Sequence, residues 1–148
     1  MPAPDASLLG IVKSLVDVVM QTPAKFVEGW LETLASHDVD AGVELYKDDA
    51  VLLGTVDKGV RKGTKDIREY FKNFLRLAPI GKITYIICEE LSGGSIAIAN
   101  GLYDFELHED GQVSSVPARF TFVLENVDLK WKILSHHSSR ISASPESS

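Results

Sequence analysis

The spacing of apolar side chains divides the chain into an N-terminal part with helical periodicity and a C-terminal part with strand periodicity. Apolar residues at i, i+3 and i+4 predict amphipathic helices, and Pro23 suits the first position of one of them. Asp38 or Asp40 can cap the next helix, and Thr64 is the expected cap of the last. The Lys47-Asp48-Asp49 cluster is expected to end the middle helix. The predicted helices cover residues 8–20, 23–36, 40–46 and 65–76.

After Pro79 the apolar pattern changes to the alternation of strands, and Asp110-Gly111 is a strong hairpin signal. The long strands are expected over residues 82–91, 95–108, 113–126 and 131–139. A short strand pair, 50–54 with 59–62, falls between the second and third of the domain's helices. Helices that precede a sheet indicate an α+β fold. A long, curved meander with helices on one face predicts a half-open cone, with a pocket between sheet and helices.

The 148 residues suit one domain. We expect an N-terminal helical extension over 1–22, the folded domain over 23–141, and a polar, disordered tail over 142–148. The segment 8–20 is apolar on most of its faces, so it should pack on the domain or on a second subunit. It holds only 13 residues, whereas a membrane span needs about 20. The N-terminus has no basic region typical of a secretory signal, so the expected compartment is the cytoplasm or a plastid.

Composition narrows the choice of partners. The formal net charge of −6 makes the chain a poor binder of phosphate backbones, so we expect no nucleic-acid partner. One cysteine, Cys88, excludes an internal disulfide and a cysteine-rich zinc module. His136 and His137 are adjacent, so a regular strand directs them to opposite faces, away from a common metal ion. No H-x-H, HExxH, CxxC or G-x-G-x-x-G pattern occurs, and neither a metal nor a nucleotide cofactor is expected.

Hydroxyl and imidazole groups are the best candidates for chemistry. Regular alternation in the last strand predicts that Ser135, His137 and Ser139 share a face with Trp131 and Ile133, and that His136 and Ser138 share the other. Further candidates are Thr55 after an apolar strand, Tyr70 on a helix face, and Arg119 and Thr121 on one strand face. Each also has a purely structural interpretation. Thr55 can form a turn and Tyr70 can pack in the core, while Arg119 can form an ion pair at an interface and Thr121 can favour a strand. Such groups suit small polar ligands that accept hydrogen bonds.

Several segments in order resemble the NTF2-like superfamily, and within it the group related to the association domain of calcium/calmodulin-dependent protein kinase II. They are LYKDDAVLLGTV (45–56), IREYFKNFL (67–75), Pro79, IAIANGLYDF (96–105), ARFTFV (118–123) and WKILSHHSS (131–139). The HHSS ending after a W-K-I strand is similar to that of iota-class carbonic anhydrases. In those enzymes a proline follows the signature, whereas this chain continues Arg140-Ile141-Ser142.

The resemblance implies reversible hydration of carbon dioxide to bicarbonate, in a site that some members build without a metal. It assigns the catalytic roles to Thr55, Tyr70 and Ser139, with His137 as the proton acceptor, and a bulge would put Ser138 in place of Ser139. Further substrate contacts are expected from Ser138, Thr121, Arg119 and Tyr103. The exposed face of the sheet and the apolar helix 8–20 both need cover, which favours a homodimer.

Two other functions stay open. The domain can be a non-catalytic oligomerisation hub, like the kinase association domain. It can also be another small-molecule lyase or isomerase of the NTF2-like type, which would use an acidic or histidine base deep in the pocket. Asp104 and Glu106, which alternate with Asn100 on one strand, are the candidates for that base.

Overall fold

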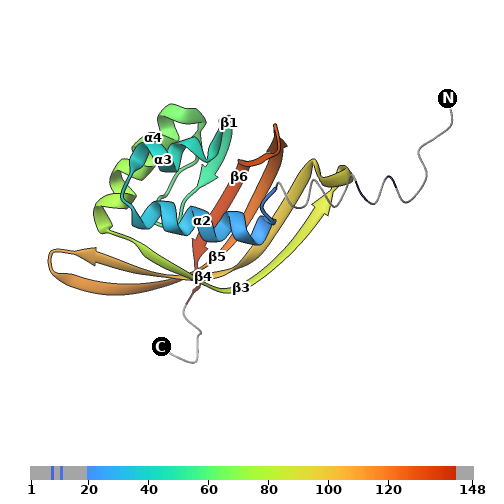
Figure 1. Cartoon of the computed structure of the whole chain (residues 1–148). Coiled ribbons are helices and arrows are strands. Elements are labelled where there is room, and N and C mark those ends of the chain that lie inside the picture. Colours follow the sequence, from blue (N-terminus) through green and yellow to red (C-terminus); the bar gives the residue numbers. More distant parts are fainter. Residues whose placement is uncertain (1–7, 9–10, 12–19, 143–148) are drawn as a thin grey trace.

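The computed structural model describes residues 20–142 together with Leu8 and Ile11, so most of the predicted helix 8–20 and nearly all of the predicted tail lie outside the described residues. Helices cover one face of a strongly curved sheet (Figure 1), which confirms the predicted α+β cone. The helices are α2 (Pro23–Ala35), α3 (Val39–Glu44) and α4 (Gly63–Phe74), with 3-10 turns η1 (Leu75–Leu77) and η2 (Ser92–Gly94). The strands are β1 (Tyr46–Leu53), β2 (Arg61–Lys62), β3 (Ile80–Leu91), β4 (Ile96–Glu109), β5 (Gln112–Val127) and β6 (Lys130–Arg140).

The helix starts follow the capping signals in two of three cases. Thr22 accepts a hydrogen bond from the Lys25 amide, and Pro23 follows as the first residue of α2. Asp38 accepts from the Ala41 amide and caps α3. The prediction that Thr64 caps α4 is wrong, because the chain turns out of β2 earlier, at Gly63, whose φ of 83° suits a glycine. In the described part of the chain, no helix is long and apolar enough to cross a membrane.

The sheet has the order β2-β1-β6-β5-β4-β3. β1 pairs antiparallel with β2, as predicted, and parallel with β6, so chain segments from the two ends of the domain meet in the middle of the sheet. The cluster at residues 47–49 lies within β1 instead of ending a helix. The prediction failed because the segment packs as a strand: Tyr46 and Ala50 at its two sides are buried in the core, while Asp48 and Asp49 between them stay exposed.

The four long strands lie within two residues of their predicted bounds, and they form the predicted meander. Asp110 and Gly111 both have positive φ, 51° and 76°, which joins β4 to β5 through the tight hairpin that their sequence favours. This hairpin extends beyond the helices in Figure 1.

One extra residue in β6 changes which side chains face the helices. Ile133 pairs with Leu124, but Ser135 pairs with Val123, so Leu134 has no partner on β5 and forms a bulge. Before the bulge, on its N-terminal side, Trp131 and Ile133 are buried. After it, on its C-terminal side, the buried residues are His136 and Ser138. The prediction of unbroken alternation, with His137 and Ser139 on the face of Trp131, is therefore wrong.

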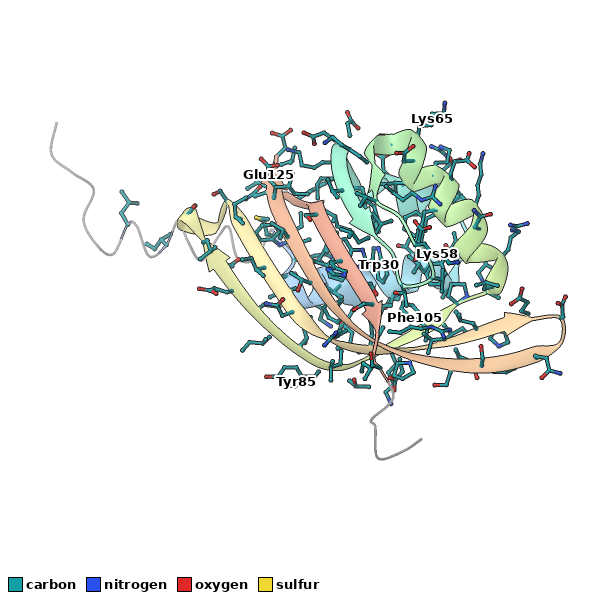
Figure 2. All side chains as sticks on the ribbon, turned by 180° about the vertical axis from the view of Figure 1, so that it is seen from behind. Trp30, Lys58, Lys65, Tyr85, Phe105 and Glu125 are labelled. Carbon is teal, nitrogen blue, oxygen red and sulfur yellow. The ribbon has the colours of Figure 1, made fainter. Side chains whose placement is uncertain are left out.

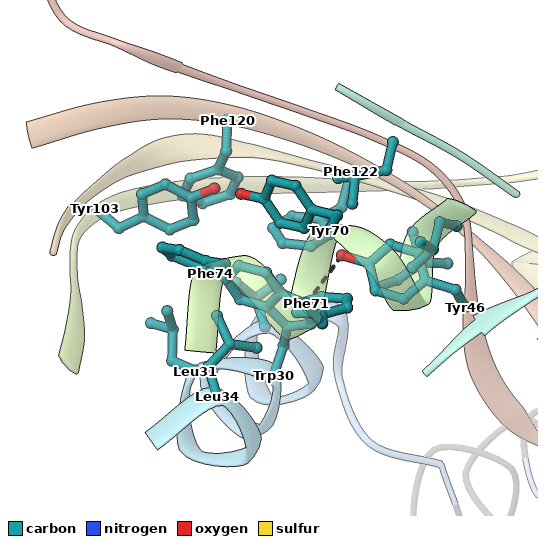
Figure 3. Close-up of a cluster of buried hydrophobic side chains, with 14 of the residues drawn as sticks. Trp30, Leu31, Leu34, Tyr46, Tyr70, Phe71, Phe74, Tyr103, Phe120 and Phe122 are labelled. Carbon is teal, nitrogen blue, oxygen red and sulfur yellow. Dashed lines mark hydrogen bonds between the residues drawn. The ribbon is translucent and has the colours of Figure 1, made fainter. Parts of the chain in front are cut away.

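Aromatic side chains fill the concave side of the sheet. Trp30 from α2 stacks on Tyr103 with ring centres 5.9 Å apart, and its edge meets Phe122 at 5.2 Å. Figure 2 shows Trp30 between α2 and the sheet, while Tyr85 projects from the opposite, convex face. Figure 3 shows how Tyr70, Phe71 and Phe74 of α4 close over the same cluster. Aromatic rings therefore fill the interior of the cone, and most of them are fully shielded from solvent.

Gly101 permits a close approach of the β3 backbone and the Phe120 ring to β4. A Cβ at this position would lie 2.1 Å from the Tyr85 carbonyl oxygen and 2.7 Å from the Phe120 ring. We expect Gly101→Ala to lower the free energy of unfolding by about 3 kcal/mol, since backbone cannot move aside as a flexible side chain does. Urea denaturation measures this. Gly29→Ala is the matched control, because nothing lies within 4 Å of the added carbon apart from its chain neighbours and the backbone of its own helix. Equal stability of the two variants would contradict the close approach.

Candidate functional site

Four hydroxyl-bearing side chains converge on the concave side of the sheet. Ser138 comes from β6, Tyr103 from β4, Tyr70 from α4, and Thr55 from the loop after β1. The Tyr103 hydroxyl donates to Ser138 Oγ at 2.6 Å, and Ser138 Oγ also hydrogen-bonds to Thr55 Oγ1. These four residues were all candidates from the sequence, and the tertiary structure brings them into one group. We call Thr55, Tyr70, Tyr103 and Ser138 the hydroxyl cluster.

Tyr70 reaches the hydroxyl cluster across a glycine. A Cβ on Gly54 would lie 2.2 Å from the Tyr70 ring, so the ring can cross the loop only because that carbon is missing. Burial raises the pKa of Tyr70, and the nearby backbone of Val56 and Thr55 offsets part of that rise. The hydroxyl groups of Tyr70 and Tyr103 point toward one another in Figure 3, which fits the electrostatic coupling between the two phenols.

A buried polar chain continues from the hydroxyl cluster into the core. The Tyr103 oxygen lies 3.3 Å from His136 Nε2, and Tyr46 Oη lies 2.9 Å from His136 Nδ1. The Trp30 indole then donates to Tyr46 Oη at 3.1 Å, a bond drawn in Figure 3. The His136 ring stacks on Phe122 with centres 3.8 Å apart. The sequence analysis did not assign His136, Tyr46 or Trp30 to the site. The adjacent histidines marked the segment, but regular alternation pointed to His137, whereas the bulge places His136 in the core.

Burial keeps this chain uncharged. His136 is 2% exposed, and removal from water, aided by the neighbouring His137, lowers its pKa to about 3. Burial raises the pKa of Tyr103 far above its ordinary value, although the neighbouring hydroxyl groups of Ser138 and Thr55 offset part of the rise. Burial likewise raises the pKa of Tyr70 and of Tyr46. At neutral pH the site therefore presents neutral hydrogen-bonding groups.

The other predicted site residues lie on the convex face. Arg119 pairs with Ser139, and Thr121 pairs with His137, across β5 and β6. The four side chains line a shallow hollow there, in which Arg119 Nε donates to Ser139 Oγ at 3.4 Å. Thr121 donates to Asn100 Oδ1 at 2.5 Å. The expected grouping of Ser139 and His137 with Thr55 and Tyr70 is therefore wrong, because the bulge at Leu134 exchanges the two faces of β6.

The acidic residues proposed as a deep base also face outward. Asp104 and Glu106 are exposed, and they alternate with the buried Tyr103, Phe105 and Leu107. The prediction that they supply a base inside the pocket is wrong, because the inward positions of β4 belong to its apolar and aromatic residues. Within residues 20–142, no group of three His, Cys, Asp or Glu side chains is placed to hold a metal ion.

Comparison with known proteins identifies related chains. The model of the SnoaL-like domain matches residues 24–144. A structure from Xanthomonas campestris, named for the association domain of calcium/calmodulin dependent protein kinase II, is 38% identical, with a TM-score of 0.78 over 82% of this chain and 86% of that chain. A comparison with curated proteins finds none that matches.

Two more distant structures share the fold alone. An NTF2-like protein with a cystatin-like fold from Novosphingobium aromaticivorans is 14% identical, with a TM-score of 0.72 over 98% of this chain and 96% of that chain. A ketosteroid isomerase-like protein from Erwinia carotovora atroseptica is 18% identical, with a TM-score of 0.62 over 77% of this chain and 89% of that chain. The fold thus occurs in proteins with different names.

The low pKa of His136 predicts that acid destabilises the protein. Between the folded value of about 3 and the ordinary value of 6.5, the unfolded chain binds a proton that the folded chain does not. The free energy of unfolding should therefore fall as pH decreases through this range, with a contribution from this group of up to about 1.4 kcal/mol per pH unit. Urea denaturation at a series of pH values measures the slope.

His136→Gln should make that slope shallower by about one proton. His137→Gln, which changes the exposed neighbour on the same strand, is the matched control and should leave the slope close to that of the wild type. Equal slopes in the wild type and His136→Gln would show that His136 is not held neutral.

Proposed function

Because the chain belongs to the SnoaL-like domain family and has the NTF2-like fold, we propose that its hydroxyl cluster is an active site for the reversible hydration of carbon dioxide. The observation that carries this proposal is the convergence of Thr55, Tyr70, Tyr103 and Ser138 in one buried, uncharged group. The resemblance of the LLGTV, REYF and HHSS segments to iota-class carbonic anhydrases supports the same reaction.

The packing around the hydroxyl cluster favours a very small substrate. Tyr103, Phe71, Phe74 and Phe105 are among the largest fully buried side chains, and they occupy the concave side that a wide substrate would need. Carbon dioxide is linear, neutral and only three atoms long, so it needs less room between such rings than a wider substrate. Removal of water strengthens the hydrogen bonds that the product then receives.

Hydration of carbon dioxide needs little covalent help from the protein. The water oxygen forms a bond to the carbon, one C=O pair of electrons moves onto oxygen, and the water gives up a proton to yield bicarbonate. In our proposal the Thr55 and Tyr70 hydroxyls donate to the oxygen on which negative charge develops, while Ser138 and Tyr103 hold Thr55 in place. The proton leaves to solvent or buffer at the loop after β1, where Thr55 is only partly buried.

Two alternatives have different support. The 38% identity to the Xanthomonas campestris structure, named for a kinase association domain, is compatible with an oligomerisation hub. An isomerase or lyase that abstracts a proton needs a base. Asp104 and Glu106 are exposed, and His136 has both ring nitrogens engaged by tyrosines, so none of these three is a free base within the hydroxyl cluster.

We propose further that the convex face pairs with a second copy of the chain. Tyr85 and Leu102 are exposed there, next to each other and beside Arg119 in the register of β3, β4 and β5. Exposed apolar groups next to polar ones are typical of association surfaces. In this arrangement Arg119, Thr121, His137 and Ser139 would serve association instead of catalysis.

The activity proposal predicts hydration of carbon dioxide that a metal chelator does not abolish. Ser138→Ala and Tyr70→Phe should each lower kcat/KM by about 100-fold, because each removes one hydroxyl from the group that stabilises bicarbonate. Stopped-flow detection of proton release, with and without chelator, measures the rate. Ser139→Ala is the matched control on the same strand and should keep the wild-type rate.

If the wild type hydrates carbon dioxide and Ser138→Ala is as active as Ser139→Ala, the hydroxyl cluster is not the active site. Loss of activity on chelation would contradict the metal-independent reaction. A folded wild type without any hydration activity would favour the hub.

The association proposal predicts a dimer that a charge on the convex face dissociates. Tyr85→Glu should shift the protein toward the monomer in analytical ultracentrifugation, because it places an unpaired carboxylate in the buried apolar part of the interface. Lys58→Glu, which changes the charge of an exposed loop residue elsewhere, is the control. A monomeric wild type would overturn this proposal.

A further inference from the structure

The buried chain from Trp30 to Thr55 has an end that can only donate a hydrogen bond. The Trp30 indole N–H has no acceptor capacity, so Tyr46 Oη must accept from it. Within the described residues, the Tyr46 hydroxyl contacts Trp30 and His136, and it is buried. If His136 Nδ1 carried a hydrogen, the hydroxyl hydrogen of Tyr46 would have no acceptor among these contacts, which costs about 1–3 kcal/mol.

The direction of each following bond depends on the one before it. The Tyr46 hydroxyl donates to His136 Nδ1, so the single hydrogen of the neutral ring lies on Nε2. Nε2–H then donates to the Tyr103 oxygen, and the Tyr103 hydroxyl donates to Ser138 Oγ. Either hydroxyl of the Ser138–Thr55 pair can donate, but Ser138 is buried, and its own hydrogen would have no acceptor among these contacts if Thr55 donated. Ser138 therefore donates to Thr55 Oγ1. Thr55 is the last member of the chain, and its own hydrogen remains available to donate.

We infer that Trp30, Tyr46 and His136 are positioning residues, which fix the direction of hydrogen bonding so that Thr55 presents a donor to the ligand. A ligand oxygen that enters beside Thr55 can accept this hydrogen. The site therefore binds a hydrogen-bond acceptor such as an oxyanion, and it rejects a cation.

Tyr70 brings a second hydroxyl to the same place. Its ring crosses the loop at Gly54, and its hydroxyl points toward that of Tyr103 in Figure 3. Burial raises the pKa of Tyr70, so the phenol keeps its hydrogen at neutral pH. Asp57 lies near Tyr70, and Arg61 neutralises it through a bond of 2.7 Å from Nε. A small anion can therefore approach the two donors without an unpaired carboxylate at the loop.

The geometry can be tested through the tautomer of His136. A long-range proton–nitrogen NMR correlation spectrum of the full chain should show a neutral ring with the hydrogen on Nε2. In Trp30→Phe, which keeps a ring but removes the indole N–H, Tyr46 is free to accept from Nδ1–H, and the spectrum should show both tautomers. Trp131→Phe is the matched control, because the Trp131 indole donates to the Gln21 carbonyl, outside the chain. It should retain the Nε2–H form.

Ligand affinity provides the second measurement. Bicarbonate titrations followed by NMR should give a dissociation constant about 5-fold weaker in Trp30→Phe than in Trp131→Phe, since one neutral hydrogen bond loses its fixed direction. Tyr46→Phe should weaken binding similarly, and it serves if Trp30→Phe does not fold. Thr55→Val, which keeps the shape without the hydroxyl, should abolish detectable binding. Methylammonium should not bind the wild type.

The inference rests on the proposed function for its choice of ligand, but its failure is distinguishable. If the wild type lacks hydration activity while the Nε2–H tautomer and the affinity pattern are found, the proposed reaction fails and the positioning chain stands. A wild-type ring with its hydrogen on Nδ1, or equal bicarbonate affinity in Trp30→Phe and Trp131→Phe, overturns the positioning chain whatever the activity.

Discussion

The bulge at Leu134 is the constraint on which the arrangement of the site depends. One unpaired residue in β6 turns His136 and Ser138 toward the helices and sends His137 and Ser139 to the convex face. Without it, the hydroxyl cluster would lack Ser138, and the imidazole between Tyr46 and Tyr103 would point into solvent. Bulges are found where a strand must redirect a side chain, and this one redirects two at once.

The bulge also explains how a polar chain can exist inside an aromatic core. A buried hydroxyl or imidazole destabilises the fold unless it is hydrogen-bonded. Here each hydroxyl or imidazole is hydrogen-bonded to the next one in the chain. In the described residues no buried side-chain nitrogen or oxygen lacks a partner. The rings of Trp30 and Phe122 hold His136 from two sides, which limits its freedom to reorient. The core is thus both the support of the site and the reason that the site is uncharged.

The two faces of the sheet carry different kinds of side chains. The concave face joins neutral hydroxyl groups with rings, which suits a small acceptor ligand. The convex face carries Arg119 beside exposed Tyr85 and Leu102, which suits association. Structures with the same fold bear names as different as kinase association domain and ketosteroid isomerase-like protein. Because the two faces lie on opposite sides of the sheet, residues on one face can change without altering the contacts made on the other.

The sequence by itself determined the helices that begin at Pro23 and before Ile67, the long strands and the Asp110-Gly111 hairpin, because local periodicity and turn chemistry encode them. The roles of Thr55 and Tyr70 came from the resemblance to iota-class carbonic anhydrases, which placed Ser139 ahead of Ser138. The sequence could not determine the parallel pairing of β1 with β6, which depends on residues about 85 positions apart in sequence. Nor could it reveal the bulge, since register belongs to a pair of strands and not to one. Only the tertiary structure decided that His136 lies in the core and His137 at the surface.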